Sequence, residues 1–270
     1  MRRRRFPLFS ALLVALLAAS IGYMTFLDAD VPRRAFSQIG AAFSRLGQSL
    51  SLVGRAGGEA TGGFIFAPSQ ATPTPASMPM LVNLDHPLAD GYVPGDLVRM
   101  RGYCDEAVVY VKGSEIDGDR EAVDALMVML KAAVAQGVGN WQISAGYRSI
   151  AYQQELWDSR VYQYRKDGLS GEQARAAAAK YVARPGCSEH HTGLAFDVTV
   201  PGESFALTDQ SKWLAEHCWD YGFIMRYTQE KSGITGFAAE PWHIRYVGQP
   251  HARIMRERDW CLEEYVNAAR

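Results

Sequence analysis

The longest apolar stretch of the chain lies at its N-terminus, where residues 6–27 carry no charged side chain and follow four arginines, Arg2–Arg5. About 20 apolar residues are enough to cross a bilayer as a helix. A basic flank before such a run is typical of a secretory signal or a signal-anchor. No convincing small-residue cleavage site follows, which favours an uncleaved anchor over a cleaved signal peptide. The positive-inside rule then places the arginines in the cytoplasm and the rest of the protein outside.

Two segments of different composition separate this apolar run from the rest of the chain. Residues 31–57 mix arginines with apolar residues at roughly helical spacing, which predicts an amphipathic helix near the membrane or a weakly ordered spacer. Residues 58–80 are rich in Gly, Ala, Thr and Pro and are typical of a linker. We therefore divide the chain into a basic tip and anchor (1–30), a juxtamembrane segment and linker (31–80), and a globular domain (81–270).

The globular domain alternates between the periodicities of helices and strands. Apolar residues at helical spacing predict helices over 120–136, 149–166, 171–182, 211–221 and 252–268. Alternating or β-branched runs predict strands over 108–111, 141–145, 194–200 and 242–247. Because strands and helices do not alternate regularly, the pattern favours an α+β fold over a doubly wound sheet.

Composition adds few constraints. Hydrophobic residues make up 48% of the 270 residues and charged residues 21%, which is ordinary for a globular protein. The net charge of −1 gives no basis for nucleic-acid binding. The length allows one domain with a substantial core plus extra segments.

The chain has four cysteines, an even number in a domain expected to be exported. Oxidising compartments favour disulfides. Of the three possible connectivities, we predict Cys187–Cys218 and Cys104–Cys261, with buried free thiols as the alternative. A four-cysteine zinc site is disfavoured because no CxxC pair exists.

Two short segments carry the chemistry of a metal site. His190 and Asp197 lie seven residues apart on either side of Gly193, and Glu240 precedes His243 by three residues. Two imidazoles and one carboxylate suit Zn²⁺ with an open fourth position. Zinc lowers the pKa of a water bound there to about 7, and an adjacent carboxylate that is not a ligand can act as general base. This predicts a zinc hydrolase with Glu240 as the base.

Each candidate has a neighbour that competes with it. His191 is the rival of His190 as ligand. Glu189, which we expect to be exposed, is a weaker rival of Glu240 as base. The remaining histidines have no motif around them, and we predict no functional role for them: His86, His217 and His251.

These motifs resemble those of a known family. The pattern Ser188-x-His190-x-x-Gly193-x-Ala195-x-Asp197, followed by Glu240-x-Trp242-His243, is similar to the signature of the VanY-type zinc D-alanyl-D-alanine carboxypeptidases in the LAS group of metallopeptidases. The resemblance extends over about residues 81–250. It implies a small, mainly antiparallel sheet with helices packed around it, as in the hedgehog-like domains of the same group.

The resemblance also implies roles for individual residues. It assigns the metal to His190 rather than His191, together with Asp197 and His243. Upstream, Tyr147-Arg148-Ser149 with Gln153 resembles the substrate-binding segment of the family. Arg148 is expected to hold the C-terminal carboxylate of the substrate or to stabilise the oxyanion, while Gln153 and Ser188 are expected to hydrogen-bond the peptide.

Together these features predict a single-pass membrane protein whose extracytoplasmic domain is a zinc D,D-carboxypeptidase. Its substrate would be the C-terminal D-alanine of peptidoglycan stem peptides, released by attack of a zinc-bound water. One alternative is an L,D-carboxypeptidase acting on tetrapeptide stems. A D,D-dipeptidase is disfavoured because an exported enzyme would not meet a cytoplasmic dipeptide. A non-catalytic, zinc-containing cell-wall binding module is the alternative of another class, and the presence of Glu240 argues against it.

Overall fold

The computed structural model describes residues 78–202 and 204–269. The predicted anchor, the juxtamembrane segment and nearly all of the linker lie outside these residues, so the predictions made for them remain predictions. Within the described ranges, no helix combines the length and the apolar character needed to cross a membrane.

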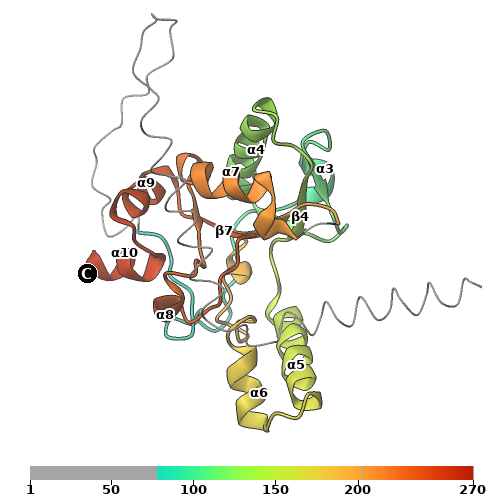
Figure 1. Ribbon diagram of the computed structural model, residues 1–270, viewed down its shortest axis with the longest axis vertical. Helices are drawn as coiled ribbons and strands as arrows, with labels where there is room; N and C mark the ends of the chain where they lie inside the picture. The colour runs from blue at the N-terminus through green and yellow to red at the C-terminus, as the bar shows by residue number, and fades with distance from the viewer. Residues whose placement is uncertain (1–77, 203, 270) are drawn as a thin grey trace, which may run out of the picture. The chain divides into compact units, whose positions relative to one another are not determined.

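Short strands and helices follow one another in mixed order along the domain (Figure 1). The strands are β1 (Leu97–Arg99), β2 (Val109–Val111), β3 (Asp117–Asp119), β4 (Trp141–Ala145), β5 (Ala195–Thr199), β6 (Phe223–Met225) and β7 (His243–Tyr246). The α-helices are α3 (Met100–Tyr103), α4 (Arg120–Ala135), α5 (Ile150–Lys166), α6 (Gly171–Ala178), α7 (Asp209–His217), α8 (Ser232–Thr235), α9 (Gln249–Arg258) and α10 (Leu262–Ala268). The 3₁₀ turns are η3 (Glu189–Thr192), η4 (Phe205–Leu207) and η5 (Cys218–Tyr221).

Five strands form the central sheet in the order β2-β4-β5-β7-β6. The β2–β4 pair is parallel, and the other three pairs are antiparallel. A separate antiparallel pair joins β1 to β3. The expected α+β fold with a small, mainly antiparallel sheet is therefore confirmed.

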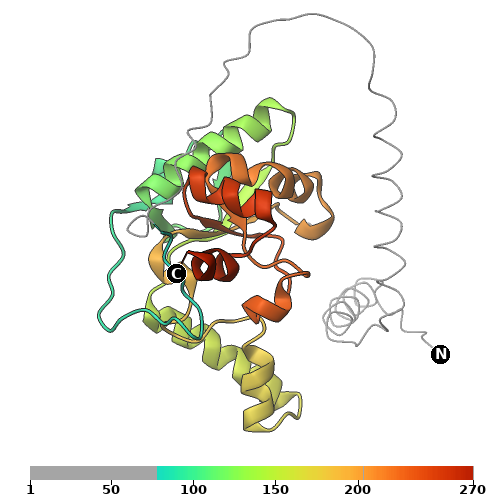
Figure 2. The same cartoon turned by 90° about the vertical axis from the view of Figure 1, so that its left-hand side faces the viewer.

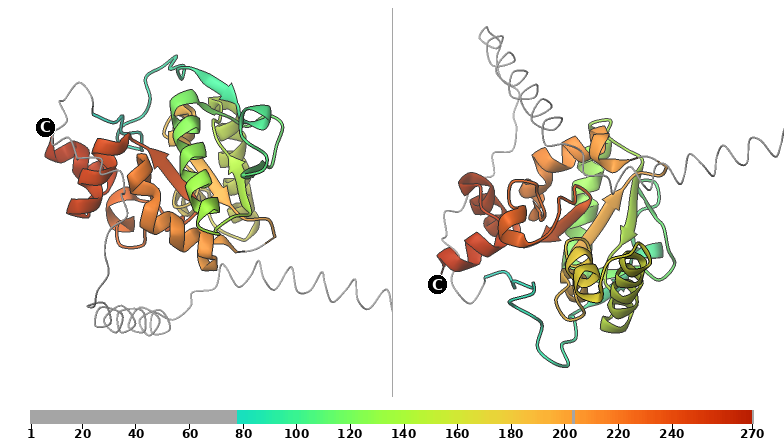
Figure 3. Two further views of the ribbon diagram at one scale, coloured as in Figure 1. Left: turned by 90° about the horizontal axis from the view of Figure 1, so that it is seen from above. Right: turned by 60° about the horizontal axis from the view of Figure 1, so that its bottom comes forward.

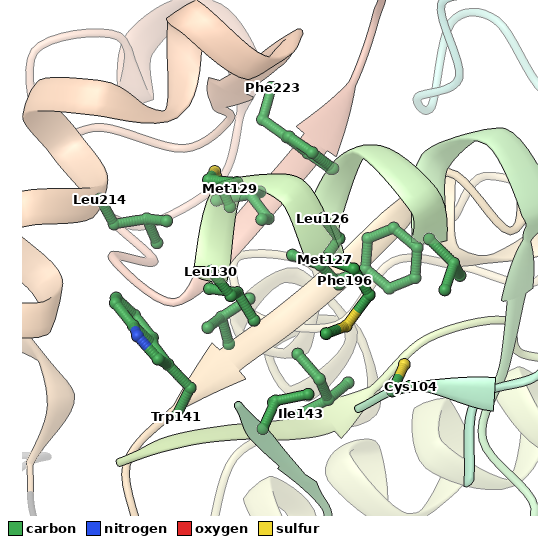
Figure 4. Close-up of a cluster of buried hydrophobic side chains, with 14 of the residues drawn as sticks. Cys104, Leu126, Met127, Met129, Leu130, Trp141, Ile143, Phe196, Leu214 and Phe223 are labelled. Atoms are coloured by element: carbon green, nitrogen blue, oxygen red, sulfur yellow. The ribbon is translucent and has the colours of Figure 1, made fainter. Parts of the chain in front are cut away.

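Helix α4 covers one face of this sheet (Figure 3). Its buried side chains, including Leu126 and Leu130, meet Ile143 of β4 and Phe196 of β5 in the main apolar cluster (Figure 4). Phe196 pairs with Ile244 of β7, and both are fully buried. Since side chains alternate along a strand, the residues between these apolar positions face the opposite side of the sheet.

Helices α5 and α6 pack against each other beside the sheet and lie next to each other in both side views (Figures 1 and 2). Ser149 caps α5 by accepting a hydrogen bond from the backbone N–H of Tyr152. Ser170 and Gln173 form a capping box at the start of α6, as Ser/Thr followed three residues later by Gln or Glu commonly does. The pair begins directly after Arg148, so it fixes the segment that carries that side chain.

The C-terminal helix expected over 252–268 is two helices. Asp259 adopts a left-handed conformation with φ of 51° and ends α9, and α10 begins three residues later. An aspartate tolerates this conformation better than most residues, and the apolar spacing continues across the break, so periodicity alone did not reveal it. The strands β1, β3 and β6 were not predicted. Each has only three residues, and β2, which is equally short, was predicted from its run of Val and Tyr.

The predicted disulfides Cys187–Cys218 and Cys104–Cys261 are wrong, because all four cysteines are free thiols in the structure. Cys104 and Cys218 both pack in the main apolar cluster. Cys261 instead precedes α10, whose buried apolar residues Leu262 and Tyr265 belong to a second apolar cluster. Burial raises the pKa of Cys104 and of Cys261 to about 11, which makes these thiols weak nucleophiles.

Candidate metal centre

Strand pairing brings two of the predicted ligands together. Asp197 of β5 and His243 of β7 are direct partners in the antiparallel register. Both point away from the face that carries Phe196 and Ile244, since the neighbouring residues on each strand belong to the apolar core. Directly opposed residues in an antiparallel pair have Cβ atoms about 4.5–5.5 Å apart, so the sheet itself places the carboxylate beside the imidazole.

The third predicted ligand comes from the turn before β5. His190 lies in η3, and Gly193 ends that turn with a φ of 74°. A Cβ at Gly193 would come within 2.7 Å of Leu97 Cδ2, so only glycine fits both the conformation and the space. His190 Nδ1 lies 2.7 Å from the carbonyl oxygen of Gly146, to which it donates a hydrogen bond. That bond leaves Nε2 as the ring atom free to bind a metal.

The three ligand atoms have the spacing of a mononuclear metal site. Asp197 Oδ1 lies 3.5 Å from His190 Nε2 and 3.3 Å from His243 Nδ1. All three atoms fall within 4.8 Å of one another. Bonds of about 2.0–2.1 Å in a tetrahedron separate neighbouring ligand atoms by about 3.3 Å. Asp197 Oδ1 is buried without a hydrogen-bond partner in the described part of the chain, so the residues present fit Zn²⁺.

The charge of the site also suits a dication. Burial lowers the pKa of His190 to about 4, which keeps that imidazole neutral, as metal ligation requires. Burial opposes ionisation of Asp197, but the two imidazoles hold its pKa well below the ordinary value. Burial opposes protonation of His243, but its contacts with Asp197 and Glu189 raise its pKa to about 9, so this ring gives up a proton when it binds a metal. With both imidazoles neutral, the ligand set carries one carboxylate charge.

Glu240 lies beside the ligand set without belonging to it. Its Oε2 is 3.7 Å from Nδ1 of His243. The backbone holds it there, because its N–H donates to the carbonyl of Tyr227 and its own carbonyl accepts from the N–H of His243. Burial raises the pKa of Glu240 to about 7. A carboxylate with a pKa near the working pH is suited to general-base chemistry.

Arg148 contacts the metal centre from the side of α5. Its Nη2 donates to Asp197 Oδ2 over 2.9 Å, and its backbone N–H donates to the carbonyl of His190. His191 fixes the same residue from the other side: its Nδ1 donates to the Arg148 carbonyl over 2.7 Å, while its Nε2 accepts from the N–H of Gly186. Both nitrogens of His191 are thus engaged outside the metal position.

The two other predicted substrate-binding residues lie close to these elements. Gln153 is buried in α5, where its Nε2 donates to the carbonyl of Ala183. Ser188 is buried at the start of η3, and its hydroxyl accepts from the backbone N–H of His190 over 3.4 Å. These contacts give both side chains structural partners, and their roles toward substrate remain predictions.

The expectation that Glu189 is exposed is wrong. Its side chain is fully buried, where Oε1 accepts from Arg226 Nε over 2.7 Å and lies 3.0 Å from Arg245 Nη1. Burial opposes ionisation of Glu189, but the two guanidinium groups hold its pKa below the ordinary value. The signal that could have revealed this was two arginines inside or beside apolar strand segments, since such arginines need buried carboxylate partners.

A buried His–Asp–His set with a free carboxylate beside it is the arrangement of a metal-dependent hydrolase. The family model described as VanY: D-alanyl-D-alanine carboxypeptidase matches residues 116–249. Putative carboxypeptidase YodJ of Bacillus subtilis is 36% identical in an alignment of 201 positions that covers 71% of this chain and 67% of that protein. The chain belongs to the VanY D-alanyl-D-alanine carboxypeptidase family.

Other relatives carry related names. A D-alanyl-D-alanine carboxypeptidase of Enterococcus faecium is 34% identical over 70% of this chain and 57% of its own length. One of Enterococcus faecalis is 42% identical over 53% of each protein. The chain therefore spans little more than half the length of these two relatives.

Solved structures share the fold. The vancomycin-resistance D,D-pentapeptidase VanY in complex with Zn(II) is 35% identical with a TM-score of 0.60, over 69% of this chain and 97% of that one. VanYB in complex with D-alanine-D-alanine is 34% identical with a TM-score of 0.62, over 71% and 98%. The LdcB LD-carboxypeptidase is 34% identical with a TM-score of 0.59, over 70% and 86%.

Proposed function

We propose that this protein is a zinc-dependent D,D-carboxypeptidase that removes the C-terminal D-alanine of peptidoglycan stem peptides. The observation that carries the proposal is the position of Glu240, whose carboxylate lies 3.7 Å from a ligand atom of His243 but outside the ligand set. A purely structural zinc site is closed by four protein ligands and needs no base. The non-catalytic binding module is therefore disfavoured. The zinc and D-alanine-D-alanine complexes of the similar VanY structures support the metal and the substrate.

The residues of the site divide the chemistry between them. Zinc held by His190, Asp197 and His243 would supply Lewis acidity to the scissile carbonyl and its attacking water. Glu240 takes the proton of that water at its carboxylate and passes it to the leaving amine. A pKa raised by burial allows Glu240 to hold this proton between the two transfers. Arg148 orients Asp197 through Nη2, and the guanidinium has further N–H donors for the substrate carboxylate or the oxyanion.

The L,D-carboxypeptidase remains the second candidate, because LdcB and DacB, two of the similar structures, are L,D-carboxypeptidases. Digestion of purified pentapeptide and tetrapeptide muropeptides, with products identified by mass, tests the proposal. We expect zinc-dependent loss of one D-alanine from the pentapeptide. Cleavage of the tetrapeptide alone would replace the D,D-activity by the L,D-activity. No zinc-dependent release of D-alanine from either would contradict both.

Replacing Arg148 with lysine should show whether its role depends on the positive charge alone or on the planar shape of the guanidinium group. Lysine keeps the positive charge but loses the planar fork that bonds a carboxylate through two N–H groups. We expect kcat/KM to fall by roughly 10²-fold, the usual cost of removing a positioned donor to a developing charge. The matched control is Arg165→Lys, an exposed arginine in the last turn of α5, which should leave kcat/KM unchanged.

The proposed role of Arg148 can also be tested by changing the substrate. If Arg148 holds the terminal carboxylate, a peptide amidated at its C-terminus should be a poor substrate for the wild type. Equal rates on the amidated and free-acid peptides would exclude carboxylate recognition and leave the oxyanion as the partner of Arg148.

The proposal includes a location outside the cytoplasmic membrane. The arginines at 2–5 and the apolar run at 6–27 support a single-pass anchor, with the catalytic domain on a linker beside the cell wall. A linker of residues 58–80 has a root-mean-square span of roughly 25 Å if flexible. Protease added to intact, wall-stripped cells should release or degrade the domain while cytoplasmic marker proteins survive. Complete protection of the domain would contradict both the topology and a cell-wall substrate.

A further inference from the structure

A cluster of four buried charged residues lies next to His243 on the Nε2 side of its ring. Arg226 contacts both carboxylates: its Nε donates to Glu189 over 2.7 Å, and its two terminal nitrogens donate to Glu263 over 2.9 and 2.6 Å. Arg245 lies 3.0 Å from Glu189. The side chains of Arg226, Arg245 and Glu189 are 0% exposed. We call these residues, Glu189, Arg226, Arg245 and Glu263, the charge cluster.

The charge cluster is electrically balanced but leaves one carboxylate oxygen without a partner. Two guanidinium groups and two carboxylates cancel, which is what permits four charges in one dry site. Glu189 Oε1 accepts from Arg226 and lies 3.0 Å from Nη1 of Arg245, which has no hydrogen-bond partner among the described residues. Glu189 Oε2, however, is buried without a hydrogen-bond partner in the described part of the chain. An unpaired carboxylate oxygen in such a site is costly, so the structure implies a donor for it.

That donor is on His243. Nδ1 of His243 faces Asp197 at the metal position, so a metal bound there fixes the remaining ring proton on Nε2. His243 Nε2 is itself buried with no hydrogen-bond partner among the described residues, and it lies 3.6 Å from Glu189 Oε2. An orphaned donor and an orphaned acceptor therefore face each other. A shift of about half an ångström brings them to hydrogen-bond distance.

We propose that Glu189 is a positioning residue of the metal centre: its carboxylate accepts the Nε2–H of His243, and Arg226 and Arg245 hold that carboxylate in place. This rests on the proposed zinc site. A carboxylate behind a metal-bound histidine fixes the tautomer and the ring orientation and raises the basicity of the ligand. Glu189 thus acts on the metal through His243, although its neighbour in the sequence, His190, is a ligand itself.

The charge cluster also assigns a role to segments outside the residues matched by the family model. Glu263 belongs to α10, and Asn83 donates to it over 3.1 Å from the start of the described chain. Arg245 donates to the carbonyl of Met80 over 2.8 Å. Residues 80–83 and α10 therefore complete the surroundings that keep both arginines directed at Glu189.

The test is the zinc affinity of Glu189→Gln, measured by competition with a chromogenic chelator. Glutamine has the same size and can still accept from Arg226, but it loses the charge that pairs with the His243 proton. We expect zinc binding to weaken by about 10–100-fold, the usual effect of removing an outer-shell partner. Glu216→Gln, an exposed carboxylate on α7, is the matched control and should bind zinc like the wild type. Zinc affinity within twofold of wild type for Glu189→Gln would overturn the proposal.

A second comparison separates positioning from general damage to the fold. Glu263→Gln removes charge from the same cluster without touching His243, so it should lower thermal stability while weakening zinc binding less than Glu189→Gln does. Equal loss of zinc affinity in both variants would assign the effect to the fold and overturn the positioning role. The visible spectrum of the cobalt-loaded Glu189→Gln protein should also change, since it reports ligand geometry.

One measurement needs no variant, in case Glu189→Gln does not fold. In zinc-loaded wild type with ¹⁵N-labelled histidine, nuclear magnetic resonance should show a proton on Nε2 of His243 that exchanges slowly with water. Absence of that proton, or rapid exchange, would overturn the proposal. These readouts are independent of catalysis: a wild type that binds zinc but releases no D-alanine would contradict the proposed function and leave the role of Glu189 to be decided by the affinities.

Discussion

Replacing His190 with alanine should remove the zinc and, with it, the activity. The ring is one of three proposed ligands among the described residues, and the neighbouring His191 cannot replace it because both of its nitrogens are bonded to the backbone. Loss of a direct ligand should exceed the roughly 10–100-fold effect of removing an outer-shell partner. Metal content after gel filtration and D-alanine release from a pentapeptide are the measurements.

The neighbouring histidine provides the control for this prediction. His191→Ala should retain one equivalent of zinc, because both nitrogens of His191 bond to the backbone of Arg148 and Gly186 instead of the metal. Its rate should fall through misplacement of Arg148. Wild-type zinc affinity in His190→Ala, or loss of zinc only in His191→Ala, would show that the ligand has been assigned to the wrong histidine.

Replacing Glu240 with glutamine should leave the metal in place and stop the chemistry. Glutamine preserves the size of this buried side chain, and Glu240 is not one of the three ligands. It cannot accept a proton from water, and loss of a general base costs about 10²–10⁴-fold in rate. We therefore expect full zinc content, unchanged thermal stability in the zinc-loaded protein, and a kcat reduced by that factor.

Two comparisons make the Glu240 result interpretable. Glu216→Gln, on the exposed face of α7, should have wild-type kcat. Glu189→Gln should differ in the opposite way, with weakened zinc binding and a rate that recovers in part when zinc is in excess. Near-normal turnover of Glu240→Gln at full zinc loading would remove Glu240 from the mechanism.

The sequence alone predicted the parts of this protein that depend on local spacing. The long helix α4 has a clear apolar period, with seven buried residues along one face. The candidate ligands were found because metal motifs combine rare residue types at fixed separations. The resemblance carried by those motifs then implied the small, mainly antiparallel sheet, which the structure confirms.

The tertiary structure decided what depends on register and burial. The pairing of Asp197 with His243 follows from two strands that are distant in the chain. The cysteines are unpaired in the structure, and an even number of cysteines in the sequence does not report whether any two of them come close enough to bond.

Glu189 is the clearest case of this division. From the sequence alone, Glu189 was expected to be an exposed carboxylate next to a candidate ligand. Its burial depends on Arg226 and Arg245, which come from two other strand segments, and on the orphaned nitrogen of His243 that faces it. A charge can be buried only where partners from elsewhere in the chain converge on it. Local patterns determined which residues carry the chemistry, and the packing of distant segments determined how they are held.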